Sequence, residues 1–231
     1  MRLNSDNKKS HLLLMPYGMY CDYNLFLEQG YSYLPDEPNF IFFIAPTYNY
    51  CTTELLTFAP YEFAQIEKYA HFDRFFFDKI SLKWNIERED LEFEREELIY
   101  PHIKYLRKHR KNFKCFPLFY HDVKNGVVKS IIEEYWGEVL FVLLTSMSIG
   151  LNYNDAKRAD EYNAEMLEYN KAENLTHLDF SAFKILPELM EFNRINNFVF
   201  RRIALQNSGD ISNNLASTTG YGAWYLDEHV K

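Results

Sequence analysis

The chain has 231 residues, which corresponds to one large domain or to one domain with appended arms. Its hydrophobic content of 47% is sufficient for a sizeable core, and 18% of its residues are aromatic. The formal net charge of −8 excludes the basic composition that is typical of general nucleic-acid-binding domains.

Three widely spaced cysteines, Cys21, Cys51 and Cys115, form no C-x-x-C pair. The spacing predicts neither a zinc knuckle nor a disulfide framework, and it favours a reducing, intracellular (cytoplasmic) setting. Cys115 has basic neighbours that could lower its thiol pKa, but we interpret it as a buried structural residue. The apolar runs are too short for a signal peptide or a membrane span, so we expect a soluble protein.

Residues 1–59 are punctuated by prolines, which disfavour helix at the preceding residue. Within this segment, the run NFIFFIA at 39–45 predicts one buried strand. LLLM at 12–15 and TTELLTF at 52–58 are its candidate partners. We expect residues 1–59 to form an irregular, partly extended segment, with one or two short strands, that packs on a helical body.

The body is expected over residues 60–206 and begins with a helix at about 60–78, in which Pro60 can occupy the first turn. A second helix is expected at 87–110, with Asn85 as a candidate cap. Pro101 lies inside this second pattern, so the helix is expected either to kink or to divide after Tyr100.

Residues 127–149 predict a third helix, which follows an Asn-Gly turn and can end at Gly150. The run VLFVLLTSMSIG at 139–150 is apolar on all sides, and we interpret it as the buried part of this helix. The last helical region is expected at 181–206, with a restart at Pro187.

Residues 152–174 predict a helix whose apolar stripe is narrow. The stripe includes Tyr162, Met166 and Tyr169, and polar side chains surround it. Such a stripe buries little surface, so we expect this helix to project or to lie along a partner helix. An edge helix of the same bundle is the alternative.

Residues 207–231 are rich in Ser, Thr, Asn and Gly and are expected to form a C-terminal arm. Trp224 and Tyr225 lie in this arm, which favours docking on the body or on a neighbour. The fold class predicted by the whole sequence is therefore mainly α, a helical bundle with an extended N-terminal segment and a C-terminal arm.

The segment from 87 to 114 changes from mostly acidic to mostly basic. Early acids and late bases complement the dipole of a helix, so the pattern is explained by a solvated helix alone. The basic part, residues 104–114, could instead contact nucleic-acid phosphates or an acidic protein. These alternatives stay open at this point.

The dipeptide His121-Asp122 resembles the core of HD-type metal-dependent phosphohydrolases, in which His and Asp bind a divalent metal that activates water. The resemblance implies an earlier His and a later Asp, for which His71 and either Asp179 or Asp155 can be nominated. In that family the dipeptide lies on a helix, whereas here Val-Lys-Asn-Gly follows and indicates a turn.

No other pattern points to chemistry, and no motif predicts a catalytic residue, a cofactor or a metal site. His102 and His109 are interpreted as surface residues, because they lack the i,i+4 spacing of a helical metal pair.

We therefore expect a non-enzymatic assembly subunit that acts through protein contacts in a homo-oligomer or larger complex. A bacteriophage connector or collar subunit is one such class, and it would place the protein in a virion. The candidate contact residues are Tyr162, Met166, Tyr169, Trp224 and Tyr225. The alternatives are an HD-like phosphohydrolase and a nucleic-acid accessory protein that uses the basic face at 104–114.

Overall fold

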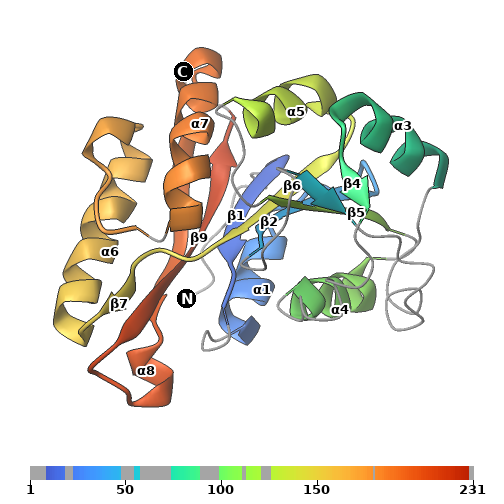
Figure 1. The fold of residues 1–231 in the computed structure, drawn as a ribbon. Helices are drawn as coiled ribbons and strands as arrows, with labels where there is room; N and C mark the ends of the chain where they lie inside the picture. The colour runs from blue at the N-terminus through green and yellow to red at the C-terminus, as the bar shows by residue number, and fades with distance from the viewer. Residues whose placement is uncertain are drawn as a thin grey trace.

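The structure, a computed structural model, describes residues 9–18, 23–47, 55–57, 74–88, 99–110, 113–120, 126–178 and 180–228. Within these ranges, nine strands form one mixed sheet with the order β4-β3-β5-β2-β6-β1-β9-β7, and β8 pairs with β9 (Figure 1). The strands are β1 Leu12–Pro16, β2 Phe40–Pro46, β3 Leu55–Thr57, β4 Glu87–Arg88, β5 Lys114–Tyr120, β6 Leu140–Thr145, β7 Ile149–Leu151, β8 Val199–Asn207 and β9 Thr218–Asp227.

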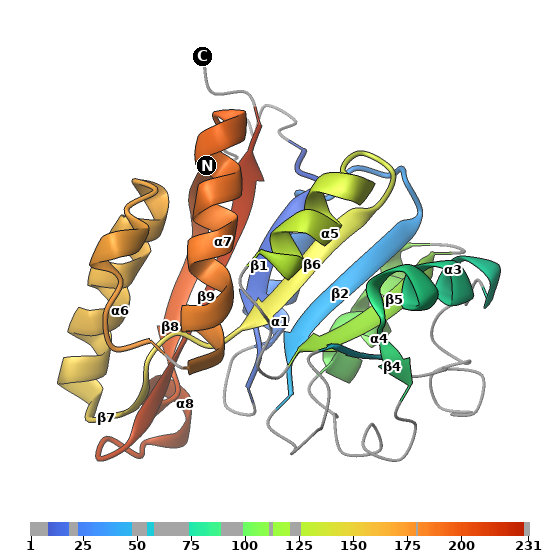
Figure 2. The same ribbon diagram turned by 45° about the horizontal axis from the view of Figure 1, so that its top comes forward.

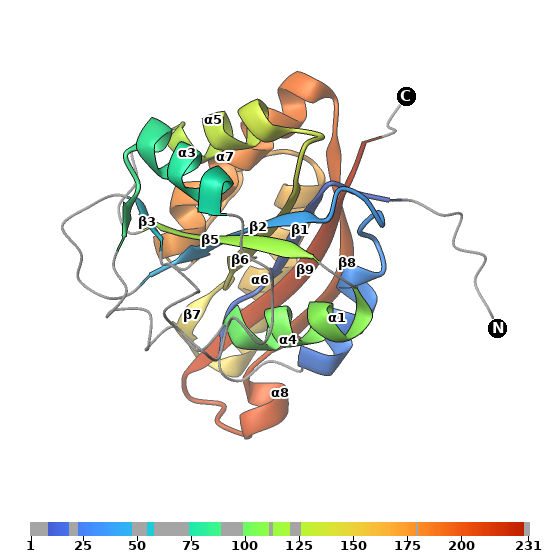
Figure 3. The same ribbon diagram turned by 90° about the vertical axis from the view of Figure 1, so that its right-hand side faces the viewer.

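Helices cover both faces of this sheet, and Figure 3 shows α3, α5 and α7 on one side and α1 and α4 on the other. The helical elements are α1 Tyr23–Tyr31, α3 Arg74–Trp84, α4 Tyr100–His109, α5 Val127–Tyr135, α6 Tyr153–Glu168, the 3-10 turn η4 Ala172–Asn174, α7 Phe180–Asn196 and the short α8 Gly209–Ser212. The prediction of a mainly α, helical bundle is therefore wrong. The molecule has an α/β fold around a central sheet.

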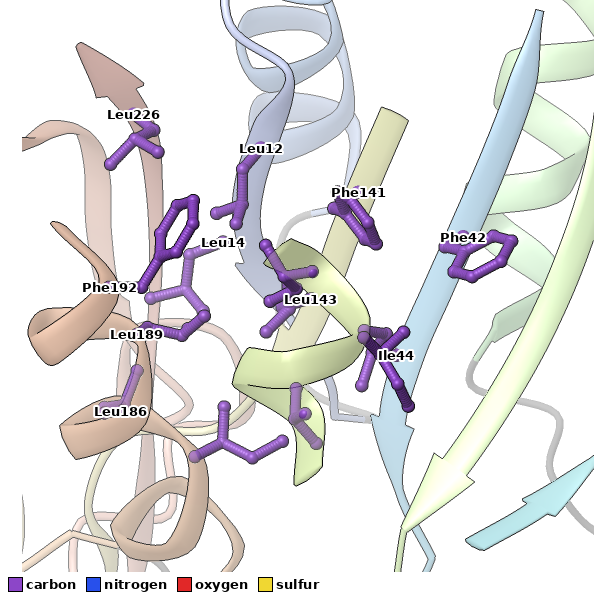
Figure 4. Close-up of a cluster of buried hydrophobic side chains, with 14 of the residues drawn as sticks. Leu12, Leu14, Phe42, Ile44, Phe141, Leu143, Leu186, Leu189, Phe192 and Leu226 are labelled. Atoms are coloured by element: carbon purple, nitrogen blue, oxygen red, sulfur yellow. The ribbon is translucent and has the colours of Figure 1, made fainter. Parts of the chain in front are cut away.

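Four parallel strands, β5, β2, β6 and β1, form the centre of the sheet. Successive side chains of a strand point to opposite faces. Leu12 of β1, Phe42 of β2 and Phe141 of β6 thus join the core beneath α5 and α7, whereas Leu13 and Phe43 join the core beneath α1 and α4. Figure 4 shows the first of these cores, where strand side chains meet Leu186, Leu189 and Phe192 of α7.

The run at 139–150, interpreted above as part of a buried helix, instead contains strand β6 and the start of β7. Helix α5 ends at Tyr135, and Gly137 follows with a φ of 82°, in the left-handed region that favours glycine. β6 then pairs with both β1 and β2. A parallel strand that is buried on both faces has a continuous apolar sequence, so periodicity does not distinguish it from a buried helix.

The two ends of the chain also differ from expectation, because both contribute strands to the sheet. β1 and β2 belong to the N-terminal segment and lie at the centre of the sheet rather than on a helical body. β9 belongs to the predicted arm, where it pairs with β1 on one side and with β8 on the other. The ring of His11 and the carboxylate of Glu228, 3.1 Å apart, further connect the two ends of the chain.

The two internal prolines have different outcomes. Pro101 lies in the first turn of α4, where the missing N–H is tolerated, and α4 starts at Tyr100. Pro187 starts no new helix, because α7 continues through it from Phe180 to Asn196. The predicted helix at 60–78 falls largely outside the described residues, and α3 begins at Arg74.

None of the helices in the described part of the chain is long and apolar enough to span a bilayer.

Candidate functional site

Helix α6 packs on the sheet and does not project from it. It begins at the cap residue Asn152, whose side-chain oxygen accepts a hydrogen bond from the Asp155 backbone N–H at 3.0 Å. Its buried face includes Ala164, Met166 and Leu167, which join the core that covers β8 and β9. Figures 1 and 2 show α6 beside α7 at this end of the sheet. The alternative of an edge helix therefore describes α6 better than the projecting helix.

A surface groove lies beside α6, with a volume of about 420 Å³. Its lining consists of Leu151, Asp155, Arg158, Ala159, Tyr162, Thr176 and His177. We call these residues the α6 groove. The Tyr162 side chain is 43% exposed, so a large aromatic ring lies in a concave surface that is open to solvent. Aromatic side chains in such positions are typical anchors of protein contacts.

Hydrogen bonds hold the far wall of the groove in place. The Asn163 amide oxygen accepts from the Thr176 backbone N–H at 3.0 Å, and the amide nitrogen donates to the Thr176 carbonyl at 2.6 Å. Asn163 is itself fully buried in α6. The segment after η4 is thereby fixed to the helix, and a partner would meet a preformed surface and lose less entropy on binding.

The charged rim of the groove is internally paired. Arg158 donates to the Asp155 carboxylate three residues earlier on the same helix. Hydrogen bonds from Arg158 and Asn152 hold the pKa of the Asp155 carboxyl below its usual value. The groove therefore combines apolar and aromatic surface with a neutralised polar edge, as protein contact surfaces do.

The other predicted contact residues are placed differently from one another. Tyr169 lies directly after α6 and is 68% exposed. Met166 and Trp224 are buried in the core. Tyr225 is half-buried and stacks on Tyr33 with ring centroids 4.2 Å apart. Only Tyr162 and Tyr169 thus offer substantial surface to a partner, and we withdraw Met166 and Trp224 from the contact site.

The sequence analysis missed Asp160, a buried carboxylate on the sheet-facing side of α6. Asp160 is 2% exposed, and its Oδ1 atom accepts from the Ser148 backbone N–H at 2.9 Å. Burial raises the pKa of this carboxyl to about 6. The sequence could have identified Asp160 as buried from its spacing, because it lies four residues from both Ala156 and Ala164 on the buried face of the helix.

The carboxyl ends of parallel strands are the usual ligand site of an α/β sheet. Here Tyr17, Thr47, Thr145 and Ser146 lie at this edge, and all four are buried. The group is polar and contains no charged side chain, and the loops that continue from it fall partly outside the described residues.

The predicted HD constellation cannot be assembled from the described part of the chain. His121 and Asp122 follow directly after β5, but they lie outside the described residues, as do His71 and Asp179. Asp155 lies on α6, where it binds Arg158. Within the ranges that the structure describes, no group of three or more His, Cys, Asp or Glu side chains is placed to hold a metal ion.

The prediction that His102 is a surface residue is wrong. Its Nε2 atom lies 3.1 Å from the Pro16 carbonyl oxygen, which can only accept, so Nε2 carries the proton. Its Nδ1 atom then accepts from the Tyr31 hydroxyl at 2.8 Å. His102 is completely buried, and burial lowers its pKa to about 3. His109, by contrast, is exposed as expected.

Cys115 is a free, buried cysteine, as predicted. Burial raises its thiol pKa to about 12, so its basic neighbours in the sequence do not activate it.

The basic segment at 104–114 divides into two parts. Lys104, Arg107 and Lys108 are exposed on the outer side of α4. Arg110 instead donates to the backbone carbonyls of residues 35, 36 and 38, so it secures the loop before β2. Residues 111 and 112 lie outside the described residues. Among the described residues of this segment, Arg110 is therefore engaged within the molecule, while Lys104, Arg107, Lys108 and Lys114 are exposed.

The sequence matches no protein-family model, and no curated protein matches it at a significant level of similarity.

Proposed function

We propose that the chain is a non-enzymatic assembly subunit that binds a second copy of itself, or another subunit of a larger complex, through the α6 groove. The observation that carries this proposal is Tyr162, a large aromatic side chain that is 43% exposed in a groove with fixed walls. As part of the same proposal, we place the protein in the cytoplasm, since its three widely spaced cysteines favour a reducing setting.

Two exposed tyrosines extend the proposed contact surface beyond the α6 groove. Tyr162 and Tyr169 are seven residues apart, which corresponds to two helical turns and about 10 Å along α6. Helical spacing places residues seven positions apart on the same side, and both side chains are exposed. A stable interface buries about 800 Å² on each partner, so the groove and both tyrosines would form its centre rather than its whole area.

Replacing Tyr162 with alanine is expected to weaken self-association by about 30-fold, which corresponds to a contact of about 2 kcal/mol. The free energy of unfolding should change by less than about 1 kcal/mol, because the side chain is substantially exposed. Mass photometry over a dilution series measures the association, and urea denaturation measures the stability.

Phe183→Ala is the matched control for this experiment. Phe183 is 46% exposed, close to the value for Tyr162, but it lies on α7 and not in the groove. It should leave the association unchanged. A wild-type protein that is strictly monomeric, with no larger complex recovered from its native source, would contradict the proposal.

A second candidate function is an accessory role in nucleic-acid binding through α4. The specific observation that favours it is the exposure of Lys104, Arg107 and Lys108 on one helix surface. The net charge of −8 opposes it, because long-range repulsion slows the approach of a polyanion.

If α4 contacts phosphates, binding to duplex DNA should weaken steeply as the salt concentration rises. The combined replacement of Lys104, Arg107 and Lys108 with alanine should then make the log–log salt slope shallower by up to about 2.7, at about 0.9 for each phosphate contact. Fluorescence anisotropy with a labelled duplex measures both effects. Arg194→Ala, an exposed cation on α7, is the control, and absent or salt-independent binding would end this candidate.

A further inference from the structure

The Asp160 carboxylate joins α6 to three other segments of the molecule. Its Oδ1 atom accepts from the backbone of Ser148, which lies between β6 and β7. A Cβ atom added to Gly220 of β9 would approach the carboxylate within 2.0 Å, so the carboxylate lies directly against the β9 backbone. Asn207, the last residue of β8, also lies beside the carboxylate.

We call this contact of Asp160 with Ser148, Asn207 and Gly220 the joint. It contains buried polar atoms that lack well-formed hydrogen bonds. The Oδ2 atom of Asp160, the hydroxyl of Ser148 and the amide nitrogen of Asn207 are all buried without a well-formed hydrogen bond. The Asp160 carboxyl is 2% exposed, and the well-formed hydrogen bond that it accepts comes from the Ser148 backbone, while the side chains of Ser148 and Asn207 lie beside it and offset only part of the effect of its burial. A buried charge with so few partners is costly, and the cost falls if water can reach it.

A cavity beside Asp160 offers a route for that water. Its volume is about 140 Å³, which is enough for a few water molecules. Its lining consists of Lys157, Asp160, Glu161, Leu205, Gln206, Asn207 and Asp210. The cavity thus lies between α6 on one side and the end of β8 with α8 on the other.

The charged groups around the cavity do not neutralise Asp160. Glu161 binds Arg202 of β8, and Asp210 of α8 accepts from the Tyr153 hydroxyl at 2.6 Å. Lys157 lies over the Tyr153 ring, 5.7 Å from its centre. β9 and the segment between β6 and β7 present no charge at the joint, since they contribute Gly220 and Ser148.

We propose that Asp160 is a proton-controlled latch for α6: the protonated carboxyl keeps the helix seated on β8 and β9, and loss of the proton lets α6 open at the cavity so that water reaches the carboxylate. The inference does not depend on the proposed function. It adds that the surface carried by α6, Tyr162 included, is held more firmly in mildly acidic solution than at neutral pH.

Hydrogen exchange of the α6 amides tests the latch directly on the wild-type chain. The Asp160 carboxyl has a pKa of about 6 in the closed state, against 3.8 for a solvated Asp. Linkage then predicts that the opening equilibrium of α6 increases about tenfold between pH 5.0 and 7.5. The exchange rates must first be corrected for the intrinsic dependence of amide exchange on pH.

Three variants identify the group that is responsible. Asp160→Asn should abolish the pH dependence. Glu165→Gln, an exposed carboxylate on the same helix, and His177→Gln, a titratable group across the groove, should both retain it. The latch is overturned if the protection of α6 in the wild type does not change with pH. It is also overturned if the protection of α6 in Asp160→Asn changes with pH as it does in the wild type.

A second measurement remains decisive if Asp160→Asn does not fold. The carboxyl carbon of Asp160 can be followed by NMR in the wild-type protein. A titration midpoint near 6 that coincides with the change in α6 exchange supports the latch, and a midpoint near 4 overturns it.

Discussion

Replacing Trp224 with alanine is expected to lower the free energy of unfolding by about 3–5 kcal/mol, the range for removal of a large buried aromatic side chain. Trp224 is 0% exposed and belongs to the core formed by the strands with α5 and α7. Its backbone pairs with Leu14 of β1 and Arg202 of β8, so the cavity would open where β9 joins the sheet. Neighbouring side chains can fill little of this cavity, because the indole packs against Gly222, which has no side chain.

Urea denaturation followed by circular dichroism measures this loss, since the signal does not depend on the tryptophan itself. Trp224→Phe is expected to cost less, because it retains an aromatic ring and removes an indole N–H that has no hydrogen-bond partner. Tyr169→Ala, at an exposed position, should change stability by no more than about 0.5 kcal/mol. A loss below about 1 kcal/mol for Trp224→Ala would show that β9 does not dock as described.

The second large effect concerns His102 and acid. Its pKa is about 3 in the folded protein and near 6.5 when the ring is solvated, because burial disfavours the charged imidazolium. Between these values the unfolded chain binds the proton and the folded chain does not. The free energy of unfolding must therefore fall as the pH falls below about 6.5, by as much as about 1.4 kcal/mol for each pH unit.

Comparison with His102→Gln isolates this contribution. A glutamine amide can accept from Tyr31 and donate to the Pro16 carbonyl, but it does not titrate. The wild type should be the more stable protein at pH 7.5, and its advantage should shrink by about 2–3 kcal/mol by pH 4.5. Urea midpoints at several pH values measure the difference.

The comparison is necessary because other groups titrate in the same range. The pKa of Asp160 is raised to about 6, so its effect has the opposite sign, and stability rises as the pH falls from about 6 toward 3.8. The pKa of His11 is raised by its hydrogen bond to Glu228, so its contribution is present below 6.5 and is lost as the pH rises. The wild type and His102→Gln both contain Asp160 and His11, so these two effects are the same in the two proteins. A difference between them that stays constant with pH would contradict the buried, neutral His102.

The candidate site was only partly predictable. Tyr162 and Tyr169 were identified from their place in the apolar stripe of α6, and both are exposed. Met166 belongs to the same stripe but faces the core. Helical spacing groups residues on one side of a helix, but it does not show where the edge of the buried surface falls.

Local chemistry in the sequence was sufficient for several elements of the fold. The helix at α6 followed from the spacing of its apolar stripe, and strand β2 followed from the run NFIFFIA between prolines. The buried state of Cys115 was also predicted. In each of these cases the signal lies within a few residues of the element itself.

Only the tertiary structure decided the fold class, because the strands that define it obtain their hydrogen bonds from distant parts of the chain. β6 has an apolar sequence that suits a buried helix equally well, and its pairing with β1 and β2 makes it a strand. β9 has the composition of a loose arm, yet it lies between β1 and β8. His102 and Asp160 acquire their shifted pKa values in the same way, since segments remote in sequence remove them from water.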